Sequence, residues 1–304
     1  MKNKTMGYEA LLLVQCFIWG VGNPIMKIGL DVITPLFCLS ARYIAAFLFF
    51  MLIFGRRVLK NVTKKHLMAY LIISIFTAAS FITGAFALVY ATATNTGFLM
   101  ATTVLFTPFL SYLILHSKLD KKHMIPIGIV TLGLYLLCSG EGQFSFGLGE
   151  GLALICAITG ACMLVFSSKY LEDMDPLTTS VMQTGFTGVF CLIFAFLFED
   201  FPDVTNIPLV GWGVILYLAI GCTCIAYVIQ NIALRHVPAT FVALSFCTEP
   251  IFTAIASFFL LREILSWKGL IGAALIMTSI IIASLLPEET DDCEPNQCVP
   301  ISEE

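Results

Sequence analysis

Long apolar stretches follow one another along the whole chain and are separated by short polar segments. A helix that crosses the roughly 30 Å hydrocarbon core of a bilayer needs about 20 apolar residues in a row. The first apolar stretch has no small-residue cleavage site and continues through Asn23, Pro24 and Lys27, so we interpret it as a span and not as a signal peptide. Ten stretches have about the required length and predict ten membrane-spanning helices, over about residues 8–30, 34–54, 66–89, 93–116, 123–140, 148–169, 176–198, 208–234, 238–261 and 267–286.

The basic residues between these stretches predict the orientation of the chain. With the N-terminus in the cytoplasm, twelve of the sixteen Lys and Arg residues lie in cytoplasmic segments, whereas the outer segments "SGEGQFSFG" and "FEDFPDVTNIP" contain neither. The exceptions are Arg262 and Lys268 in the last outer loop, and Lys27 and Arg42 inside or at the edge of spans. Because short basic loops stay in the cytoplasm, both termini are expected there.

The second half of the sequence resembles the first at an offset of about 142 residues. Pro108 in "LFTPFLSYLIL" aligns with Pro250 in "CTEPIFTAIAS", and Lys27 aligns with Lys169. Each half then holds five spans, and because five is odd the second half enters the membrane upside down. We therefore predict an all-α integral membrane protein of two inverted five-helix repeats, residues 8–140 and 148–286, followed by a disordered acidic cytoplasmic tail at 287–304. Inverted repeats are typical of transporters that work by alternating access.

Composition supports a membrane protein and excludes several other classes. Of the residues, 59% are hydrophobic and 12% are charged, which is too little polar surface for a soluble domain. The net charge is -4 without a large basic patch, so no nucleic-acid partner is expected. Nine of the eleven cysteines, from Cys16 to Cys247, lie in apolar runs and are interpreted as core residues. Cys293 and Cys298 lie in the tail without a histidine beside them, so neither a metal nor a cofactor is predicted.

Two segments of the chain resemble a known family. "IWGVGNPIMKIGLDVITPLFCLSARY" resembles the opening of an EamA domain, and "NIALRHVPATFVALSFCTEP" resembles its second copy. The similarity runs from about Glu9 to Leu286, although "SKLDKK" stands where the family usually has Gly-Glu-Arg. It implies a transporter of the drug/metabolite superfamily but is not specific for the cargo, since similar sequences export amino acids, other metabolites, purine compounds or drugs. We expect the export of amino acids or related polar metabolites across the cell membrane. No phosphate-binding loop is present, which favours a secondary transporter over an ATP-driven pump, and no catalytic set indicates an enzyme.

The Glu-Pro pair in the ninth stretch is the main candidate for a site. Glu249 is about eleven residues into its span and therefore about 16 Å deep. An ionised carboxylate is costly there, so it either binds a cationic group of the cargo or a coupling proton, or braces a neighbouring helix through hydrogen bonds. Pro250 removes a helix hydrogen bond beside it, and Pro24 and Pro108 are expected to interrupt their own helices in the same way.

Other polar groups within the spans also need partners away from lipid. Arg42 and Lys27 either attract an anionic group, or make an internal pair or reach the membrane surface. Phe81 and Phe86, with Trp19 and Tyr227, are candidates for an aromatic lining. The candidates for a shared cavity are Gln15, Trp19, Asn23, Ser80, Thr83, Thr103, Thr107, Tyr227, Gln230, Asn231, Ser245 and Thr248. Each of these residues can instead join two helices through hydrogen bonds or packing.

The sequence therefore favours a secondary transporter of a small molecule, with membrane lipids around it and protons as a candidate coupling ion. A monomer is the simplest assembly because ten spans form a complete path in one chain, and a dimer stays an alternative. Two other functions stay open. The same scaffold can serve an importer or exchanger, and buried polar groups can also belong to a structural or assembly protein of the membrane.

Overall fold

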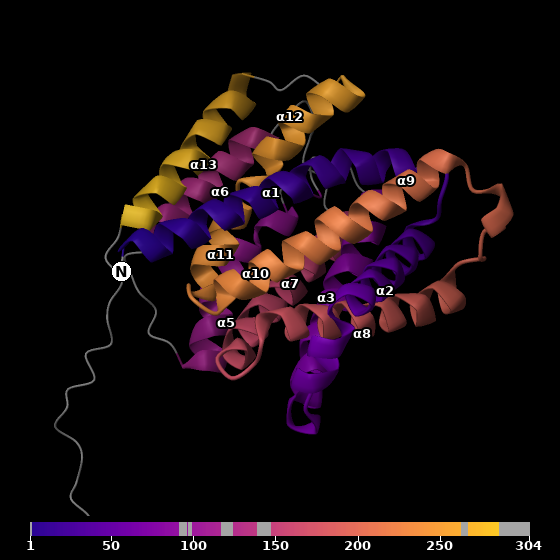
Figure 1. Cartoon of the computed structure of the whole chain (residues 1–304). Helices are drawn as coiled ribbons and strands as arrows, with labels where there is room; N and C mark the ends of the chain where they lie inside the picture. Colours follow the sequence, from indigo (N-terminus) through magenta and orange to yellow (C-terminus); the bar gives the residue numbers. More distant parts are fainter. Residues whose placement is uncertain are drawn as a thin grey trace, which may run out of the picture.

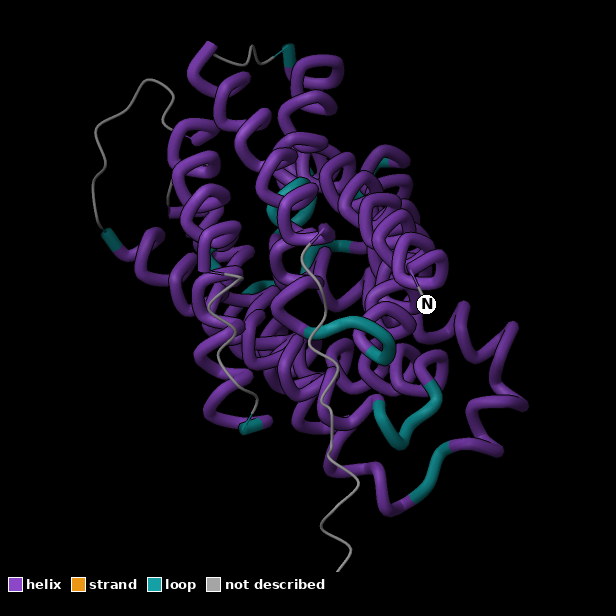
Figure 2. The backbone as a smooth tube through the Cα atoms, turned by 90° about the vertical axis from the view of Figure 1, so that its left-hand side faces the viewer, coloured by secondary structure: helices purple, strands orange, loops and turns teal. Residues whose placement is uncertain are grey.

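A computed structural model describes residues 2–90, 96, 99–116, 124–138, 147–262 and 267–285 of the chain. Within these ranges the backbone is helix, turn and loop, and no strand occurs (Figure 2). The elements are α1 (Lys2–Leu30), α2 (Pro35–Asn61), η1 (Lys64–His66), α3 (Leu67–Tyr90), α5 (Thr103–Leu115), α6 (Met124–Cys138), α7 (Leu148–Leu171), α8 (Pro176–Phe198), η3 (Val204–Asn206), α9 (Leu209–Tyr217), η4 (Leu218–Ile225), α10 (Ala226–Leu234), α11 (Ala239–Phe246), α12 (Glu249–Leu261) and α13 (Trp267–Leu285).

Seven helical segments of the described chain are long and apolar enough to cross a membrane. Two further apolar helices, Leu99–Leu115 and Met124–Gly133, are shorter. Large apolar side chains cover much of the outside, with Leu52 84% and Leu209 87% exposed, as expected for helices that face lipid. The protein is therefore a multi-pass membrane protein, while the count of ten spans stays a prediction. The predicted tail, with Cys293 and Cys298, lies outside the described residues.

The helices pack in pairs that are far apart in the sequence. In Figure 1, α1 and the run from α9 to α10 cross the middle of the molecule, with α6, α12 and α13 on one side and α2, α3 and α8 on the other. α2 packs along α8, α6 along α13, and α3 along α7, while α1 contacts both α10 and α12. The largest buried cluster contains residues from α1, α3, α7, α10 and α11, so it joins the two halves of the chain.

Both ends of the α2–α8 pair are held by polar contacts. At one end the carboxylate of Glu199 accepts hydrogen bonds from the backbone N–H groups of Leu36 (2.9 Å) and Phe37 (3.0 Å), which begin α2. At the other end Arg57 of α2 forms an ion pair of 2.8 Å with Asp175, the residue that caps α8. Free N–H groups at a helix start need an acceptor, and in an apolar setting a carboxylate satisfies them well.

The prediction that three prolines interrupt their helices is wrong for two of them. α1 continues through Pro24 and α5 continues through Pro108. A proline removes one hydrogen bond, and neighbouring helices in a membrane protein compensate for that loss. The break occurs instead before Pro250, where α11 ends at Phe246 and α12 begins at Glu249. Proline is well suited to the first turn of a helix because its missing N–H has no partner there.

We expect Gly133 of α6 to be required for packing, because a Cβ there would lie 2.8 Å from the carbonyl oxygen of Gly272 in α13. Gly133→Ala should lower the free energy of unfolding in detergent by about 1–3 kcal/mol, as overpacked positions do. Gly128 on the same helix is the matched control, since a Cβ there meets nothing within 4 Å. Gly128→Ala should be neutral or stabilising by up to about 1 kcal/mol. Equal effects of the two changes would contradict this account.

Asp175 should make stability depend on pH. Partial burial acts to raise the pKa of Asp175, but hydrogen bonds from the Thr178 hydroxyl and N–H and the contact with Arg57 outweigh it and hold the pKa below its ordinary value. The carboxylate therefore stabilises the fold above the unfolded pKa of about 4, and this contribution is lost as the pH falls through the lower folded pKa. Asp175→Ala should cost about 1–2 kcal/mol at neutral pH, mostly from the lost cap.

Thermal unfolding of both forms from pH 7 to pH 3 measures this effect, and the difference between them should shrink at the acidic end. Arg57→Gln is the control. It removes an ion pair whose arginine is 58% exposed and leaves the cap intact, so it should cost less than about 1 kcal/mol. If the difference between wild type and Asp175→Ala stays constant down to pH 3, the pKa of Asp175 is not lowered in the folded protein and this account is wrong.

Candidate functional site

Glu249 lies at the first position of α12 and is hydrogen-bonded to α1. Its Oε1 accepts from Nδ2 of Asn23 at 2.7 Å, and the same amide nitrogen donates to Oγ1 of Thr253 at 3.1 Å. Asn23 is exposed, while Glu249 and Thr253 are partly exposed. The carboxylate is thus oriented by another helix, on a residue that is only partly buried.

A very close approach of two helices forms this contact. A Cβ on Gly20 of α1 would lie 2.5 Å from Cβ of Phe252 and 3.0 Å from the carbonyl oxygen of Glu249. Only a residue without a side chain fits at this distance, as at other close helix crossings in membranes. Gly20 is three residues before Asn23, so the crossing brings the amide onto the carboxylate.

Arg42 of α2 lies inside the protein with 3% of its surface exposed, and it does not reach the membrane surface. Its Nε donates to Oγ1 of Thr223 at 3.2 Å. The guanidinium carbon lies 4.9 Å from the ring centre of Tyr43 and 5.1 Å from that of Phe81. Lys27, by contrast, is exposed in the last turn of α1. Of the two cations that the sequence singled out, Arg42 is therefore the interior one.

Aromatic side chains surround Arg42 and continue toward α1. The ring of Tyr227 lies 6.2 Å from that of Tyr43 and 6.4 Å from that of Phe81, and the two tyrosine hydroxyls are hydrogen-bonded. Trp19 packs edge to face on Tyr227 at 6.3 Å and on Phe246 at 5.1 Å. Trp19, Tyr227, Phe81 and Phe86 belong to one packed cluster. We refer to Trp19, Tyr43, Phe81, Tyr227 and Phe246 as the aromatic cluster.

The helix that carries Thr223 has a π-helical segment, η4, between α9 and α10. Its wide turns leave carbonyl groups free for other donors. The indole Nε1 of Trp19 donates to the carbonyl oxygen of Cys222 at 2.8 Å, and the Thr223 hydroxyl donates to the carbonyl oxygen of Leu218 at 3.0 Å. Sequence analysis missed this segment, as well as Thr223 and Tyr43, because no residue type specifies a π-turn. π-Turns frequently occur at functional sites.

Gln15 and Gln230 meet in the interior, further along α1. Nε2 of Gln15 donates to Oε1 of Gln230 at 3.3 Å, and Nε2 of Gln230 contacts the Met163 sulfur at 3.3 Å. Both glutamines are fully buried, and Oε1 of Gln15 has no hydrogen-bond partner. An unpaired buried amide oxygen is costly, so this pair is suited to accept a further donor.

Several other predicted site residues use their hydroxyls to satisfy backbone groups. Ser80 donates to the carbonyl oxygen of Cys156 at 3.0 Å, and Thr103 donates to that of Ala157 at 3.1 Å, which joins α3 and α5 to α7. The remaining hydroxyls bond within their own helices or at the break between α11 and α12: Thr83, Thr107, Ser245 and Thr248. The shared cavity of these residues stays a prediction.

A buried hydrogen-bond network joins α3, α8 and α10 at some distance from Glu249. Asn231 donates to Ser180 at 2.9 Å and to Gln183 at 3.2 Å, and Gln183 donates to Thr77 at 2.8 Å. Of these four residues the sequence singled out Asn231 alone. The fully buried positions of all four indicate a role in holding the helices together.

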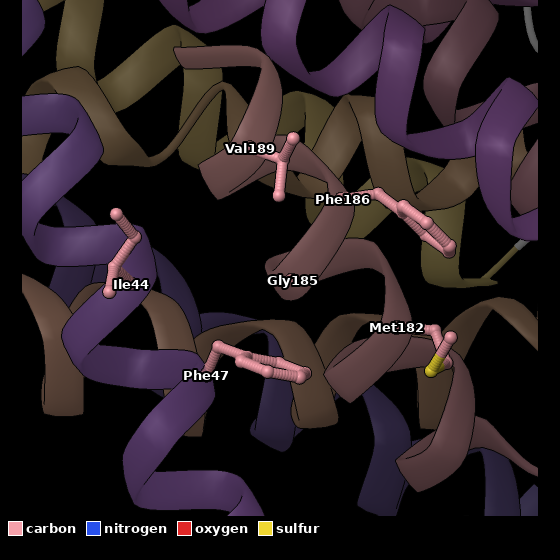
Figure 3. A pocket seen from close by; sticks show the side chains of 6 residues that line it. All are labelled: Ile44, Phe47, Met182, Gly185, Phe186 and Val189. Atoms are coloured by element: carbon pink, nitrogen blue, oxygen red, sulfur yellow. The ribbon is translucent and has the colours of Figure 1, made fainter. Parts of the chain in front are cut away.

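The groove between α2 and α8 is not a candidate polar site. It has a volume of about 320 Å³ and is lined by Ile44, Phe47, Met182, Gly185, Phe186 and Val189 (Figure 3). All of its lining side chains are apolar, which suits a surface in contact with lipid. Within the described residues no group of three or more His, Cys, Asp or Glu side chains is arranged to hold a metal ion.

The family model and the similar proteins both indicate a transporter. The model of the EamA-like transporter family matches residues 6–139 and again residues 147–285. An uncharacterized transporter of Archaeoglobus fulgidus is 28% identical over 275 residues, covering 90% of this chain and 84% of that protein. The uncharacterized transporter YyaM of Bacillus subtilis is 26% identical and covers 79% of this chain and 80% of its own length.

A solved structure described as "Crystal structure of protein" has the same fold, with a TM-score of 0.77 at 17% identity, and it covers 92% of this chain and 97% of that chain. The two family matches together extend over nearly all of the described residues, including the helices that carry Glu249, Arg42 and the aromatic cluster. The chain belongs to the EamA-like transporter family.

Proposed function

We propose that this membrane transporter exports a small polar metabolite, such as an amino acid, by alternating access without ATP. The observation that carries the proposal is the carboxylate of Glu249, which Asn23 of another helix orients at 2.7 Å. A charged group inside a membrane protein is costly unless it is used, and it is typical of substrate or ion pathways. The site binds its cargo and does not transform it, so the protein is not an enzyme.

Packing between helices supports the proposed inverted repeats of residues 8–140 and 148–286. If α7 corresponds to α1, then α8 corresponds to α2, α10 to α3, α12 to α5 and α13 to α6. The α2–α8 and α6–α13 contacts each pair a helix with its own counterpart. The α3–α7 contact likewise has its counterpart in the contact of α10 with α1, and the α5–α7 contact in that of α12 with α1. A two-fold axis in the membrane plane relates such contacts, and ten spans complete the arrangement.

The proposed orientation has both termini in the cytoplasm of a cell that carries the protein in its cell membrane. The basic residues Arg56, Arg57 and Lys60 near the end of α2 then lie on the cytoplasmic side, as the charge bias requires. Asn23 and Glu249 lie in the outer half. A monomer with surrounding lipid is sufficient for this scheme, because the charged and aromatic groups come from one chain.

In this scheme Glu249 alternates between two kinds of partner. In the described state it accepts a hydrogen bond from Asn23. During transport a cationic group of the cargo or a proton neutralises the carboxylate, which lowers the cost of moving it through the membrane interior. The remaining uncharged candidates are proposed to surround the path, with Gln15 and Gln230 on the cytoplasmic side of Trp19 along α1.

Flux from liposomes tests the transport function and the role of Glu249. Vesicles containing the purified chain and a mixture of the twenty amino acids should release at least one of them with saturable kinetics, and an imposed proton gradient should change the rate. Glu249→Gln should reduce this rate at least about tenfold, the effect of losing one charge-assisted contact. Thr253→Val is the control, since it removes a neighbouring hydroxyl and keeps the carboxylate.

Three results would contradict parts of this scheme. Equal release by wild type and Glu249→Gln would reduce Glu249 to a structural brace. Uptake without release would make the protein an importer. No saturable movement of any compound from a complete metabolite extract, in either direction, would favour a structural or assembly protein.

Gly20→Ala should impair transport through the geometry of Glu249. The added methyl group meets the backbone of α12 at less than 3.0 Å, so α1 and α12 must separate and the Asn23–Glu249 contact lengthens. We expect a loss of flux of about tenfold or more, a size that small misplacements of reacting groups produce. Gly7→Ala on the same helix meets nothing within 4 Å and is the matched control. Full activity of Gly20→Ala would show that the close crossing does not position the site.

A further inference from the structure

The guanidinium of Arg42 lies inside the protein with unused hydrogen-bond donors. It is 3% exposed, and it is the only buried Lys or Arg among the side chains that the structure describes. Its Nε donates to Oγ1 of Thr223 at 3.2 Å, which is its one hydrogen bond to the described residues. A guanidinium carries five N–H donors, so those on the terminal nitrogens have no partner in this part of the chain. An enclosed cation without a counter-charge is strongly unfavourable.

The terminal nitrogens of Arg42 border a space that a small particle can enter. The fully enclosed polar atoms that lack a partner in the described chain include Oε1 of Gln15 and Oδ1 of Asn231, but not these nitrogens. Because the nitrogens have no protein partner either, they differ from those atoms in being exposed. The 3% of Arg42 that remains exposed therefore includes its terminal nitrogens, and a particle the size of a water molecule can touch them.

Carboxylates of the protein interior are engaged elsewhere. Both oxygens of Glu199 accept backbone N–H groups at the start of α2. Glu249 accepts from Asn23, and Glu150 accepts from the backbone N–H just before α7. No carboxylate of the described residues forms an ion pair with Arg42. The negative charge that balances the guanidinium therefore comes from outside these residues.

The neighbours of Arg42 leave the edge of the guanidinium open and supply one more donor. The rings of Tyr43 and Phe81 lie 4.9 and 5.1 Å from its central carbon and contact its face. Such contacts are weaker than an ion pair. The hydroxyls of Tyr43 and Tyr227 bond to each other, which uses one of their two protons. The other proton has no acceptor among the described residues, so the pair can donate to an anion beside Arg42.

These features favour a small inorganic anion with a single charge. One guanidinium balances one negative charge, whereas sulfate or a doubly charged phosphate usually needs several cations or a row of backbone N–H groups. A carboxylate also matches the guanidinium edge, but it brings an organic remainder, for which a side chain that is 3% exposed leaves little room. Chloride meets these requirements, and it loses its water shell at lower cost than fluoride.

We propose that Arg42 holds a chloride ion between its terminal nitrogens and the hydroxyl pair of Tyr43 and Tyr227. The ion is a resident counter-ion and not the transported molecule. Arg42 and Tyr43 lie on α2 and Tyr227 lies on α10, so the bound ion stabilises a contact between the first and the second half of the chain. The site depends neither on the identity of the cargo nor on transport.

Thermal unfolding of the purified full chain in detergent tests the proposal. Sodium chloride is exchanged stepwise for sodium gluconate, whose large anion does not fit the site, and constant ionic strength keeps the screening of surface charges the same. The midpoint of wild type should rise with chloride by about 2 °C or more and then level off, as expected for a ligand that binds only the folded state.

Two arginine variants identify the site of the chloride effect. Arg42→Gln removes the positive charge and should abolish the dependence of the midpoint on chloride. Arg57→Gln is the matched control, because this arginine is 58% exposed and pairs with Asp175. It should keep the full dependence on chloride, whatever its own effect on stability.

Fluorescence of Trp19 measures occupancy of the site directly. The chain has three tryptophans, and the changes Trp212→Phe and Trp267→Phe leave Trp19, whose ring lies 6.3 Å from that of Tyr227. Bromide is close to chloride in size and quenches indole fluorescence through its heavy atom. Quenching by bromide should be saturable, and chloride should reverse it. Arg42→Gln should weaken bromide at least about tenfold, the value of one charge-assisted contact.

A series of anions tests the site on wild type alone, so the proposal stays testable if Arg42→Gln does not fold. Bromide should stabilise the protein as chloride does. Acetate, whose carboxylate carries a methyl group, and the doubly charged sulfate should act like gluconate at equal ionic strength.

Three results would overturn the proposal. Equal midpoints in chloride and gluconate would mean that water alone solvates the guanidinium. Equal stabilisation by acetate and chloride would make this a carboxylate site. An unchanged chloride effect in Arg42→Gln would place the ion elsewhere. All of these measurements are made without cargo, so their failure leaves the proposed transport function standing, and a failure of transport in liposomes leaves the chloride site standing.

Discussion

The crossing of α1 and α12 at Gly20 is the contact on which the geometry of the site depends. Helix axes are usually 8–10 Å apart because side chains separate them. At Gly20 no side chain intervenes, and a Cβ would lie 2.5 Å from Cβ of Phe252. The amide of Asn23 therefore reaches the carboxylate of Glu249 directly, and Trp19, one turn earlier, reaches the carbonyl group of Cys222. One small residue thus sets how closely α1 approaches α12 beside Glu249.

The polar residues of the interior divide into two kinds according to how fully their hydrogen bonds are satisfied. Ser80 and Thr103 donate to backbone carbonyls of α7, and their bonds end within the protein. Such groups stabilise helix contacts by about 0.6 kcal/mol each. Arg42, Glu249 and Gln15 instead have hydrogen-bond donors or acceptors that no described residue pairs with. Polar residue type alone does not separate these kinds, because both consist of residues that avoid lipid.

The sequence was sufficient to predict a helical membrane protein, because that follows from long apolar runs, whereas the role of Glu249 stays a prediction. It did not predict the π-helical segment η4, in which Thr223 meets Arg42, since that turn results from tertiary packing. The continuous helix at Pro24 has a related cause. A proline predicts a break only when no neighbouring helix supports the chain, and α1 is in contact with both α10 and α12.

The two charges of the site belong to differently anchored parts of the fold. Arg42 lies on α2, which Glu199 and the Arg57–Asp175 pair fasten to α8 at both ends, whereas Glu249 lies on α12, which is joined to α1 at Gly20. The link between these parts consists of the aromatic cluster and the Trp19–Cys222 hydrogen bond. Aromatic faces slide over one another at lower cost than ion pairs separate, because their contacts are weakly directional. A molecule bound at this connection would therefore act on the weakest link between two rigid parts, which is where binding changes a conformational equilibrium most.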